Sequence, residues 1–335
     1  MSDRMSAPAQ QQHEQSLVDM AGVVLDEACW EAYLLGFARD VPNYLHVFGE
    51  RMTAMAGVDR REFRRAVVRD PEAAVGLLID SGAFALDIDA HVADLERQGV
   101  RRQVMLGGMV PLRDGGSFNG RVAEFAQRHP ERLEAWAGLD FRDPDAALAE
   151  LRTCVLERGM RGAGIAHFLD GSDPLAPGSH AVYAEAARLG VPFWIHAGHN
   201  LSGTRPVDFC TWRHLDAIAR AHPDLVVIAG HGGWPWVLET VAICQRHPNV
   251  YLEFSTHRAP HMAVPGSGWE PLLAHGRATI RHKVLFGSVT WAHGLSVREL
   301  ADEVVALDLG ERVTAMWLHD NGARLLDLTR REVTA

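Results

Sequence analysis

Residues 225–254 read LVVIAGHGGWPWVLETVAICQRHPNVYLEF, and this stretch contains the repeating unit of the fold. An uninterrupted apolar run (225–230) leads into a glycine turn, a helical pattern follows, and a second apolar run (249–254) completes the unit. Apolar runs of this length, bounded by turn signals, are typical of strands that are buried on both faces. Strands of this kind joined by helices run parallel, so the stretch predicts a β-α-β crossover.

Eight apolar runs of this kind alternate with helical patterns along the chain. Eight β-α units favour a closed (β/α)8 TIM barrel, in the α/β class, over an open doubly wound sheet. No G-x-G-x-x-G follows a strand, so nothing supports a nucleotide-binding domain. The predicted strands are 16–24, 102–106, 133–139, 161–166, 192–197, 225–230, 249–254 and 283–288.

The connection after the first predicted strand is a long insert, residues 25–84, rich in aromatic residues and arginines. In a barrel, the loop after a strand lies on the face that carries the active site. We therefore expect 25–84 to form a helical cap over the site, with an ordinary helical decoration as the alternative. Residues 16–335 are expected to form a single domain, and the polar stretch 1–15 a disordered tail.

Composition narrows the class of protein. The chain has 335 residues, 47% of them apolar, and its formal net charge of -10 argues against a nucleic-acid partner. No apolar run is long enough to span a membrane, and the N-terminus lacks the apolar core of a secretory signal. The four cysteines show no C-x-x-C spacing. We interpret them as buried free thiols and expect a cytoplasmic protein.

Covalent catalysis has no support in the sequence. Lys283 is the one lysine of the chain, and it starts a predicted strand, away from any site built where the strands end. This placement disfavours a Schiff base and a carbamylated-lysine metal bridge. No G-x-S-x-G occurs and no cysteine stands at a strand end, so a serine or cysteine nucleophile is also unsupported.

Eight segments follow one another in a characteristic order: DLERQGVRRQVML (94–106), RHPERLEAWAGLD (128–140), ERGMRGAGI (157–165), GVPFWIHAGH (190–199), DLVVIAGHGGWPWVLE (224–239), HPNVYLEFST (247–256), KVLFGS (283–288) and NGARLLDL (321–328). No single segment is specific, but their order and spacing resemble the amidohydrolase superfamily. The resemblance is to the amidohydrolase-related branch that includes aminocarboxymuconate-semialdehyde and resorcylate-type decarboxylases. It covers nearly the whole chain after residue 16.

The resemblance implies a divalent metal held by two histidines from strand one, one histidine from strand five and an aspartate from strand eight. Position by position, these ligands fall on Ala21, Val23, His196 and Val289. Alanine and valine offer no lone pair, and one histidine cannot fix a metal in a defined geometry. We therefore expect no metal and no other cofactor, and a barrel mouth that is drier and less anionic.

A relocated metal is the alternative. His199 lies three residues after His196, and His231, Glu253 and His257 follow neighbouring strand ends, where they could form a new cluster. The opposing interpretation is that these side chains hydrogen-bond to one another and to the substrate.

Histidine is the natural acid or base once the metal is lost, because its ordinary pKa of about 6.5 lies near neutral pH. The resemblance implies that a histidine at the end of strand six acts on the bound water or substrate, and His231 has this position. We predict His231, His196 and Glu253 as catalytic residues, with Glu253 as the carboxylate partner of a histidine. The alternatives are a structural histidine in the glycine turn and a salt bridge from Glu253 to Arg258.

Substrate contacts are predicted on the loops after the strands and in the insert. Trp234 is expected to wall an aromatic or polyunsaturated ligand, with core packing as the alternative. Arg51 is expected to bind a substrate carboxylate bidentately. The predicted substrate-binding residues are His199, Asn200, Trp234, His257, His46 and Arg51.

These residues predict a metal-independent enzyme that acts on a small acidic or aromatic molecule. Decarboxylation, another C–C lyase step, cyclisation or hydrolysis of an activated lactone fits proton transfer in a dry pocket. Amide hydrolysis is disfavoured, because nothing replaces a metal that lowers the pKa of water. A pseudoenzyme that binds a ligand and a hydrolase with a relocated ion are the alternatives. A homodimer is possible by analogy with the family.

Overall fold

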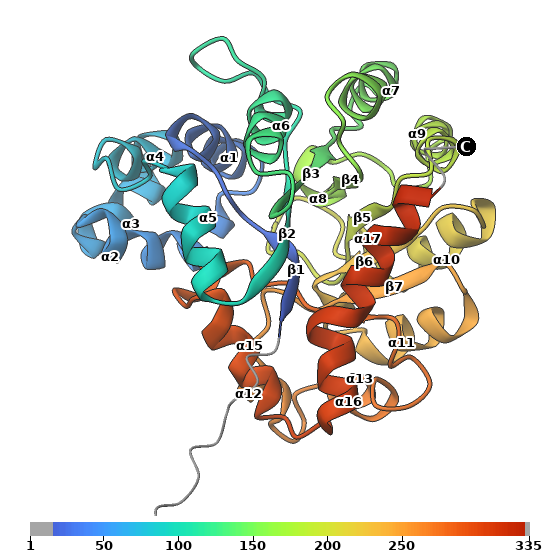
Figure 1. The fold of residues 1–335 in the computed structure, drawn as a ribbon. Helices are drawn as coiled ribbons and strands as arrows, with labels where there is room; N and C mark the ends of the chain where they lie inside the picture. Colours follow the sequence, from blue (N-terminus) through green and yellow to red (C-terminus); the bar gives the residue numbers. More distant parts are fainter. Residues whose placement is uncertain (1–15, 332–335) are drawn as a thin grey trace, which may run out of the picture.

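The computed structural model describes residues 16–331, so the predicted tail 1–15 lies outside the described residues. Eight parallel strands follow one another in chain order around a barrel (Figure 1). All eight predicted strands and the α/β barrel are confirmed. The strands are β1 (Leu17–Gly22), β2 (Val100–Leu106), β3 (Leu133–Gly138), β4 (Ala163–Ile165), β5 (Phe193–His196), β6 (Val227–Gly230), β7 (Val250–Glu253) and β8 (Val284–Leu285).

The barrel closes between β1 and the segment that follows β8. The amide of Met20 donates to the carbonyl of Phe286 at 2.8 Å. The carboxyl of the buried Asp19 accepts from the amide and the hydroxyl of Ser288, at 2.8 and 2.6 Å, and from Gln103 at 2.8 Å. Asp19 therefore joins the first strand to the last and to the second, and it does not line the central cavity.

Helices pack around the outside of the barrel (Figure 1). Their starts follow ordinary capping rules: Asp87 caps α5, and Asp143, followed by Pro144, caps α7. After the insert come α5 (Ile88–Arg97), α6 (Phe118–Arg128), α7 (Pro144–Arg152), η2 (Thr153–Glu157), α8 (His167–Asp170), α9 (Pro177–Arg188), α10 (Trp212–Ala221), η3 (His231–Gly233), α11 (Val237–Arg246), α12 (Ala259–Met262), α13 (Glu270–His275), α14 (Thr290–His293), α15 (Val297–Val305), α16 (Glu311–Ala315), η4 (Met316–Asp320) and α17 (Asn321–Arg331).

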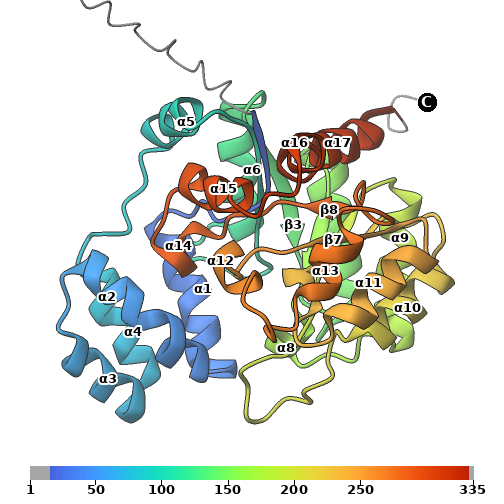
Figure 2. The same cartoon turned by 90° about the horizontal axis from the view of Figure 1, so that it is seen from below.

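The long insert after β1 is helical. Figure 2 shows α2, α3 and α4 grouped to one side of the barrel. The side chains of Tyr33, Phe37, Tyr44 and Phe48 line the central cavity, so the first part of the insert forms a wall of the site. The insert contains α1 (Glu27–Asp40), the π-helical turn η1 (Leu45–Gly49), α2 (Glu50–Ala56), α3 (Arg60–Arg69) and α4 (Pro71–Ile79).

Apolar side chains fill the inside of the barrel, so the site is confined to its mouth. The packed cluster is Val18, Met20, Val104, Trp136, Ile228 and Leu285, with Leu325 and Leu326 from α17. Lys283 directly precedes β8, at the opposite end from the site as predicted, and its ammonium donates to the carbonyl of Cys244 at 2.7 Å. The four cysteines are free and buried, also as predicted. Within residues 16–331, no helix has the length and apolarity that a membrane crossing needs.

Candidate active site

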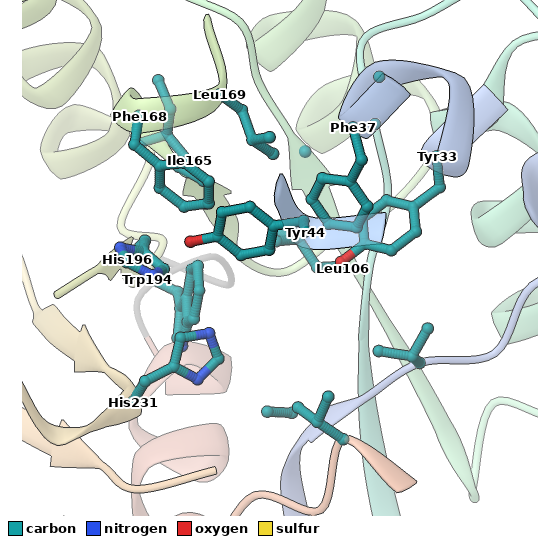
Figure 3. Close-up of a pocket in the computed structure, with 18 of the residues that line it drawn as sticks. Tyr33, Phe37, Tyr44, Leu106, Ile165, Phe168, Leu169, Trp194, His196 and His231 are labelled. Atoms are coloured by element: carbon teal, nitrogen blue, oxygen red, sulfur yellow. The ribbon is translucent and has the colours of Figure 1, made fainter. Parts of the chain in front are cut away.

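A cavity of about 500 Å³ opens at the ends of the strands, and its lining is mostly apolar (Figure 3). Two imidazoles, His196 at the end of β5 and His231 after β6, stand on one side of it. The rings of Tyr33 and Phe37, both from α1, stand on the other. Each strand end contributes to the lining, through Gly22, Leu106, Gly138, Ile165, His196, His231, Thr256 and Val289.

The positions that the family resemblance assigns to metal ligands are apolar. Ala21, Val23 and Val289 line the cavity together with His196. Three of these four side chains carry no donor atom, so the set does not fit a divalent ion. Among residues 16–331, no group of three or more histidine, cysteine, aspartate or glutamate side chains is placed to hold a metal. The relocated metal cluster therefore has no support either.

His196 is buried, with 8% of its surface exposed. Its ring centroid lies 4.5 Å from that of Phe168 and 5.2 Å from that of His231, both edge-on. Burial lowers the pKa of His196 to about 3, so the imidazole is neutral near pH 7. Its Nδ1 atom is buried and has no hydrogen-bond partner among the described residues.

His231 begins a hydrogen-bonded chain that runs back into the barrel. Its Nδ1 lies 2.8 Å from the hydroxyl of Ser255, and this hydroxyl donates to Oε2 of Glu253 at 3.0 Å. A serine hydroxyl has one proton, so the bond to Glu253 requires that Ser255 accepts from a protonated Nδ1. This tautomer leaves the Nε2 lone pair of His231 free. We call the chain His231–Ser255–Glu253 the relay.

Glu253 is fully buried at the end of β7. Besides both donors of Ser255, its carboxyl accepts from the indole of Trp194 at 3.3 Å and from the amide of His231 at 3.4 Å. Burial outweighs these hydrogen bonds and raises the pKa of Glu253 to about 7. Burial also holds the pKa of His231 well below its usual value. The alternative salt bridge to Arg258 is absent, because Arg258 pairs with Glu303.

Three residues with strained, positive φ angles lie just after the ends of β6, β7 and β8. His231, Thr256 and Val289 have φ angles of 64°, 67° and 40°, and all three line the cavity. Residues other than glycine avoid this region, β-branched ones most strongly, and each instance costs roughly 1–3 kcal/mol. Gly232 and Gly233 continue the left-handed turn after His231 without such strain. Strain at three strand ends around one cavity is typical of a functional site.

Three predicted substrate-binding residues line the cavity. The ring of His199 meets Trp234 edge-on at 5.2 Å, and Trp234 lies 6.1 Å from His257. Burial lowers the pKa of His257 to about 4, so this imidazole is neutral as well. The indole of Trp234 donates to the carbonyl of Ser267 at 3.0 Å, which fixes the ring in the wall.

The other three predicted substrate-binding residues, Asn200, His46 and Arg51, lie outside the lining of the central cavity. The amide of Asn200 donates to the carbonyl of Pro206 at 3.0 Å, and its oxygen accepts from the amide of Ser202 at 3.0 Å, so Asn200 shapes its own loop. His46 on η1 and Arg51 on α2 are exposed. The sequence identifies the insert but not the direction in which its helices turn these side chains.

Sequence reasoning missed Ser255 and the tyrosines of the cavity wall. Ser255 lies two residues after Glu253, the spacing that places two side chains on one face of an extended chain. That spacing was a usable signal. No sequence signal distinguishes the aromatic residues of the insert that line the cavity, such as Tyr33 and Tyr44, from those that pack in its core.

A further histidine, His167 on α8, is buried but does not line the cavity. Its Nε2 lies 2.7 Å from the hydroxyl of Tyr183, and its Nδ1 lies 2.7 Å from that of Ser172, which donates to Asp170. Burial lowers the pKa of His167 to about 3. Both of its nitrogens are occupied, so its role is structural, whereas His231 keeps one nitrogen free.

Comparison with known proteins extends the family resemblance. A family model of amidohydrolases matches residues 83–328. Gamma-resorcylate decarboxylase of Rhizobium radiobacter is 32% identical over 140 residues, which are 34% of this chain and 43% of that protein. The chain matches 26% to 48% of the length of its curated relatives, which include a 2-amino-3-carboxymuconate-6-semialdehyde decarboxylase of Dictyostelium discoideum.

Solved structures show the same fold. An uncharacterized TIM-barrel protein from Bordetella bronchiseptica aligns with a TM-score of 0.66 at 18% identity, over 94% of this chain and 100% of that one. A 5-carboxyvanillate decarboxylase from Novosphingobium aromaticivorans, with bound manganese, aligns with a TM-score of 0.63 at 16% identity, over 94% and 98%. The family match spans most of the chain, so the chain belongs to the amidohydrolase superfamily, in the branch of these decarboxylases.

Proposed function

We propose that this chain is a metal-independent enzyme in which His231, through the relay, transfers protons to and from a small aromatic molecule. Decarboxylation or another C–C lyase step is the first reaction that we propose, because the curated relatives are named decarboxylases. Cyclisation and hydrolysis of an activated lactone need the same groups. The observation that carries the proposal is the hydrogen-bonded path from an imidazole of the cavity wall to a buried carboxyl.

The relay can carry a proton in either direction. With Glu253 ionised, Nε2 of His231 accepts a proton, and the carboxylate 4.0 Å from Nδ1 stabilises the imidazolium. With Glu253 protonated, its proton passes to Ser255, that of Ser255 passes to Nδ1, and the proton on Nε2 is available to the substrate. The pKa of Glu253, about 7, means that both forms are populated near neutral pH.

Decarboxylation uses the second form. His231 delivers its Nε2 proton to the ring carbon that bears the carboxylate. The bond to the carboxylate then breaks, its electron pair restores the aromatic ring, carbon dioxide leaves, and Glu253 is left ionised. Ala21, Val23 and Val289 keep this part of the cavity apolar. A carboxylate is poorly solvated there, and the loss of carbon dioxide disperses its charge.

A ligand-binding protein without turnover is the second candidate, because drift after lost catalysis would also remove metal ligands. The intact relay and the strained backbone at His231 favour the enzyme, since a binding protein needs neither a proton path nor strain at that residue.

Two measurements test the proposal. Metal analysis of the purified protein is expected to find no stoichiometric transition metal, and release of carbon dioxide from hydroxylated aromatic acids is expected to be insensitive to chelators. The variant His231→Gln is expected to lose roughly 10²-fold or more in turnover. His282 is an exposed histidine at the opposite end of the barrel, so His282→Gln serves as the matched control and is expected to keep the wild-type turnover. Full turnover in His231→Gln, or a bound ion whose removal abolishes turnover, would overturn the proposal.

A further inference from the structure

The central cavity is larger than one aromatic ring requires. Its volume of about 500 Å³ corresponds to on the order of fifteen water molecules. Cavities of this size hold ligands of drug-like dimensions. A single-ring acid would leave much of the apolar wall in contact with water, whereas a larger apolar ligand would displace that water with a favourable free energy.

A row of aromatic rings follows the cavity wall from His196 to α1 (Figure 3). Phe168 stacks on Tyr44, with centroids 5.0 Å apart and planes at 14°, and Tyr44 stacks on Phe37 at 5.1 Å and 12°. Tyr33 then meets Phe37 edge-on at 4.7 Å. Such a row provides extended contact for a ligand of several fused rings.

Two polar groups at the α1 end of this row have no partner among the described residues. The hydroxyl of Tyr33 makes no hydrogen bond, while that of Tyr44 accepts from the amide of Leu201 at 3.3 Å. The indole nitrogen of Trp291, whose ring meets Tyr33 edge-on at 6.1 Å, is also unpaired and buried. Burial raises the pKa of Tyr33, so its hydroxyl stays protonated and donates. The buried indole nitrogen of Trp291 would normally have an acceptor, and a bound ligand would supply one to it and to the hydroxyl of Tyr33, which lines the same cavity.

The lining contains no cation that is free to bind a carboxylate. Arg142 is the one arginine or lysine of the described residues that lines the cavity, and its guanidinium is held by both carboxyl oxygens of Asp140. The other charged side chains of the lining are Asp40 and Asp170. Affinity must therefore come from apolar contact and neutral hydrogen bonds, not from an ion pair.

We propose that the cavity binds an aromatic substrate of two or three fused rings, whose oxygen at one edge accepts a hydrogen bond from Tyr33 while the opposite edge reaches His196 and His231. The placement of the reacting end rests on the proposed proton transfer by His231. The size of the ring system and the contact with Tyr33 are independent of it. Tyr33 is thus a specificity-determining residue.

A matched series of ligands tests this proposal: 4-pyridone, 4-quinolone and acridone carry the same carbonyl on one, two and three rings. Their Kd values are measured by fluorescence or calorimetry on the full-length protein. We expect at least tenfold tighter binding for each added ring, because tenfold requires about 55 Å² of additional apolar burial. Acridone-4-carboxylate is expected to bind no more tightly than acridone. Equal affinities across the series, or a gain from the carboxylate, would overturn the proposal.

The variant Tyr33→Phe isolates the hydrogen bond. It is expected to weaken acridone binding roughly three- to tenfold and to leave the binding of anthracene, which has three rings and no acceptor, unchanged. Retained anthracene binding also shows that the variant is folded. Tyr251→Phe removes a phenol outside the lining and is the matched control. An unchanged affinity of Tyr33→Phe for acridone would contradict the role of Tyr33.

Failure of this proposal is distinguishable from failure of the proposed function. His231→Gln is expected to lose turnover but to keep the ring-size trend, because the aromatic row and Tyr33 are intact. Tight acridone binding with no proton-transfer activity would refute the enzyme and support the fused-ring site. Proton transfer on a single-ring substrate, without the ring-size trend, would support the enzyme and refute the fused-ring site.

Discussion

The wild type is expected to lose stability as the pH rises, because Glu253 releases its proton. Replacing Glu253 by glutamine is expected to abolish this pH dependence. Burial raises the pKa of this carboxyl from 4.5 to about 7. Between these values the unfolded chain has released the proton that the folded protein keeps, so a rising pH favours unfolding. The stabilisation from protonated Glu253 is therefore complete below pH 4.5 and is lost as the pH passes through 7.

The magnitude follows from the two pKa values. At ~1.4 kcal/mol per pH unit, the change from 4.5 to about 7 gives about 3 kcal/mol, without reduction for solvent screening because Glu253 is fully buried. Urea titrations at pH 5, 6, 7 and 8 measure the free energy of unfolding of the wild type and of Glu253→Gln. Subtracting one curve from the other removes the pH dependence that other titrating groups contribute to both proteins. Glu311→Gln, at an exposed glutamate, is the matched control. Parallel curves for the wild type and Glu253→Gln would refute the raised pKa.

The remaining predictions concern the relay, the strained backbone, the lost ligands and the structural histidine. Ser255→Ala is expected to lower kcat roughly 10- to 100-fold with little change in KM, because it breaks the path to the carboxyl; steady-state kinetics over a pH range measure this. Thr256→Gly is expected to raise the free energy of unfolding by about 1 kcal/mol in urea titrations, since glycine relieves the positive φ angle of this half-buried residue. Ala21→His, Val23→His and Val289→Asp together are expected to raise manganese affinity at least tenfold by calorimetry, as four ligands then meet. Burial holds the pKa of His167 at about 3, so stability is expected to fall by ~1.4 kcal/mol per unit as the pH drops below 6.5, where the unfolded chain binds the proton first; His167→Gln should flatten that slope in titrations from pH 4 to 7.

The barrel was predictable because each strand leaves a local signal. The runs 225–230 and 249–254 are apolar on both faces and are bounded by glycine or proline turns, as parallel buried strands require. Strand lengths were less predictable. The predicted strand 283–288 shortens to Val284–Leu285, where the amide of Phe286 donates to the carbonyl of Trp317 and not to a neighbouring strand. Such a long-range contact leaves no local pattern.

The site was predictable only where topology decides it. His196, His231 and Glu253 follow three neighbouring strands, and the ends of parallel strands meet at one rim. Arg51 depends instead on how the helices of the insert pack, which its local sequence does not determine. The protonation states also need the fold, because they arise from burial among groups that are distant in the sequence.

A divalent ion and the relay are electrostatically incompatible in this cavity. Gly287 is flanked by both Ala21 and Glu253, and a Cβ atom there would overlap with both side chains, so an ion held beside Ala21 would lie close to the carboxyl. A charge of +2 in these apolar surroundings would lower the pKa of Glu253 and keep it ionised. A permanent carboxylate cannot donate to Ser255, so the relay could not supply an acid. The triple variant that binds manganese is therefore expected to lose the pH dependence of stability that Glu253 causes. A manganese-loaded variant that keeps this dependence would show that a bound ion and the relay are compatible.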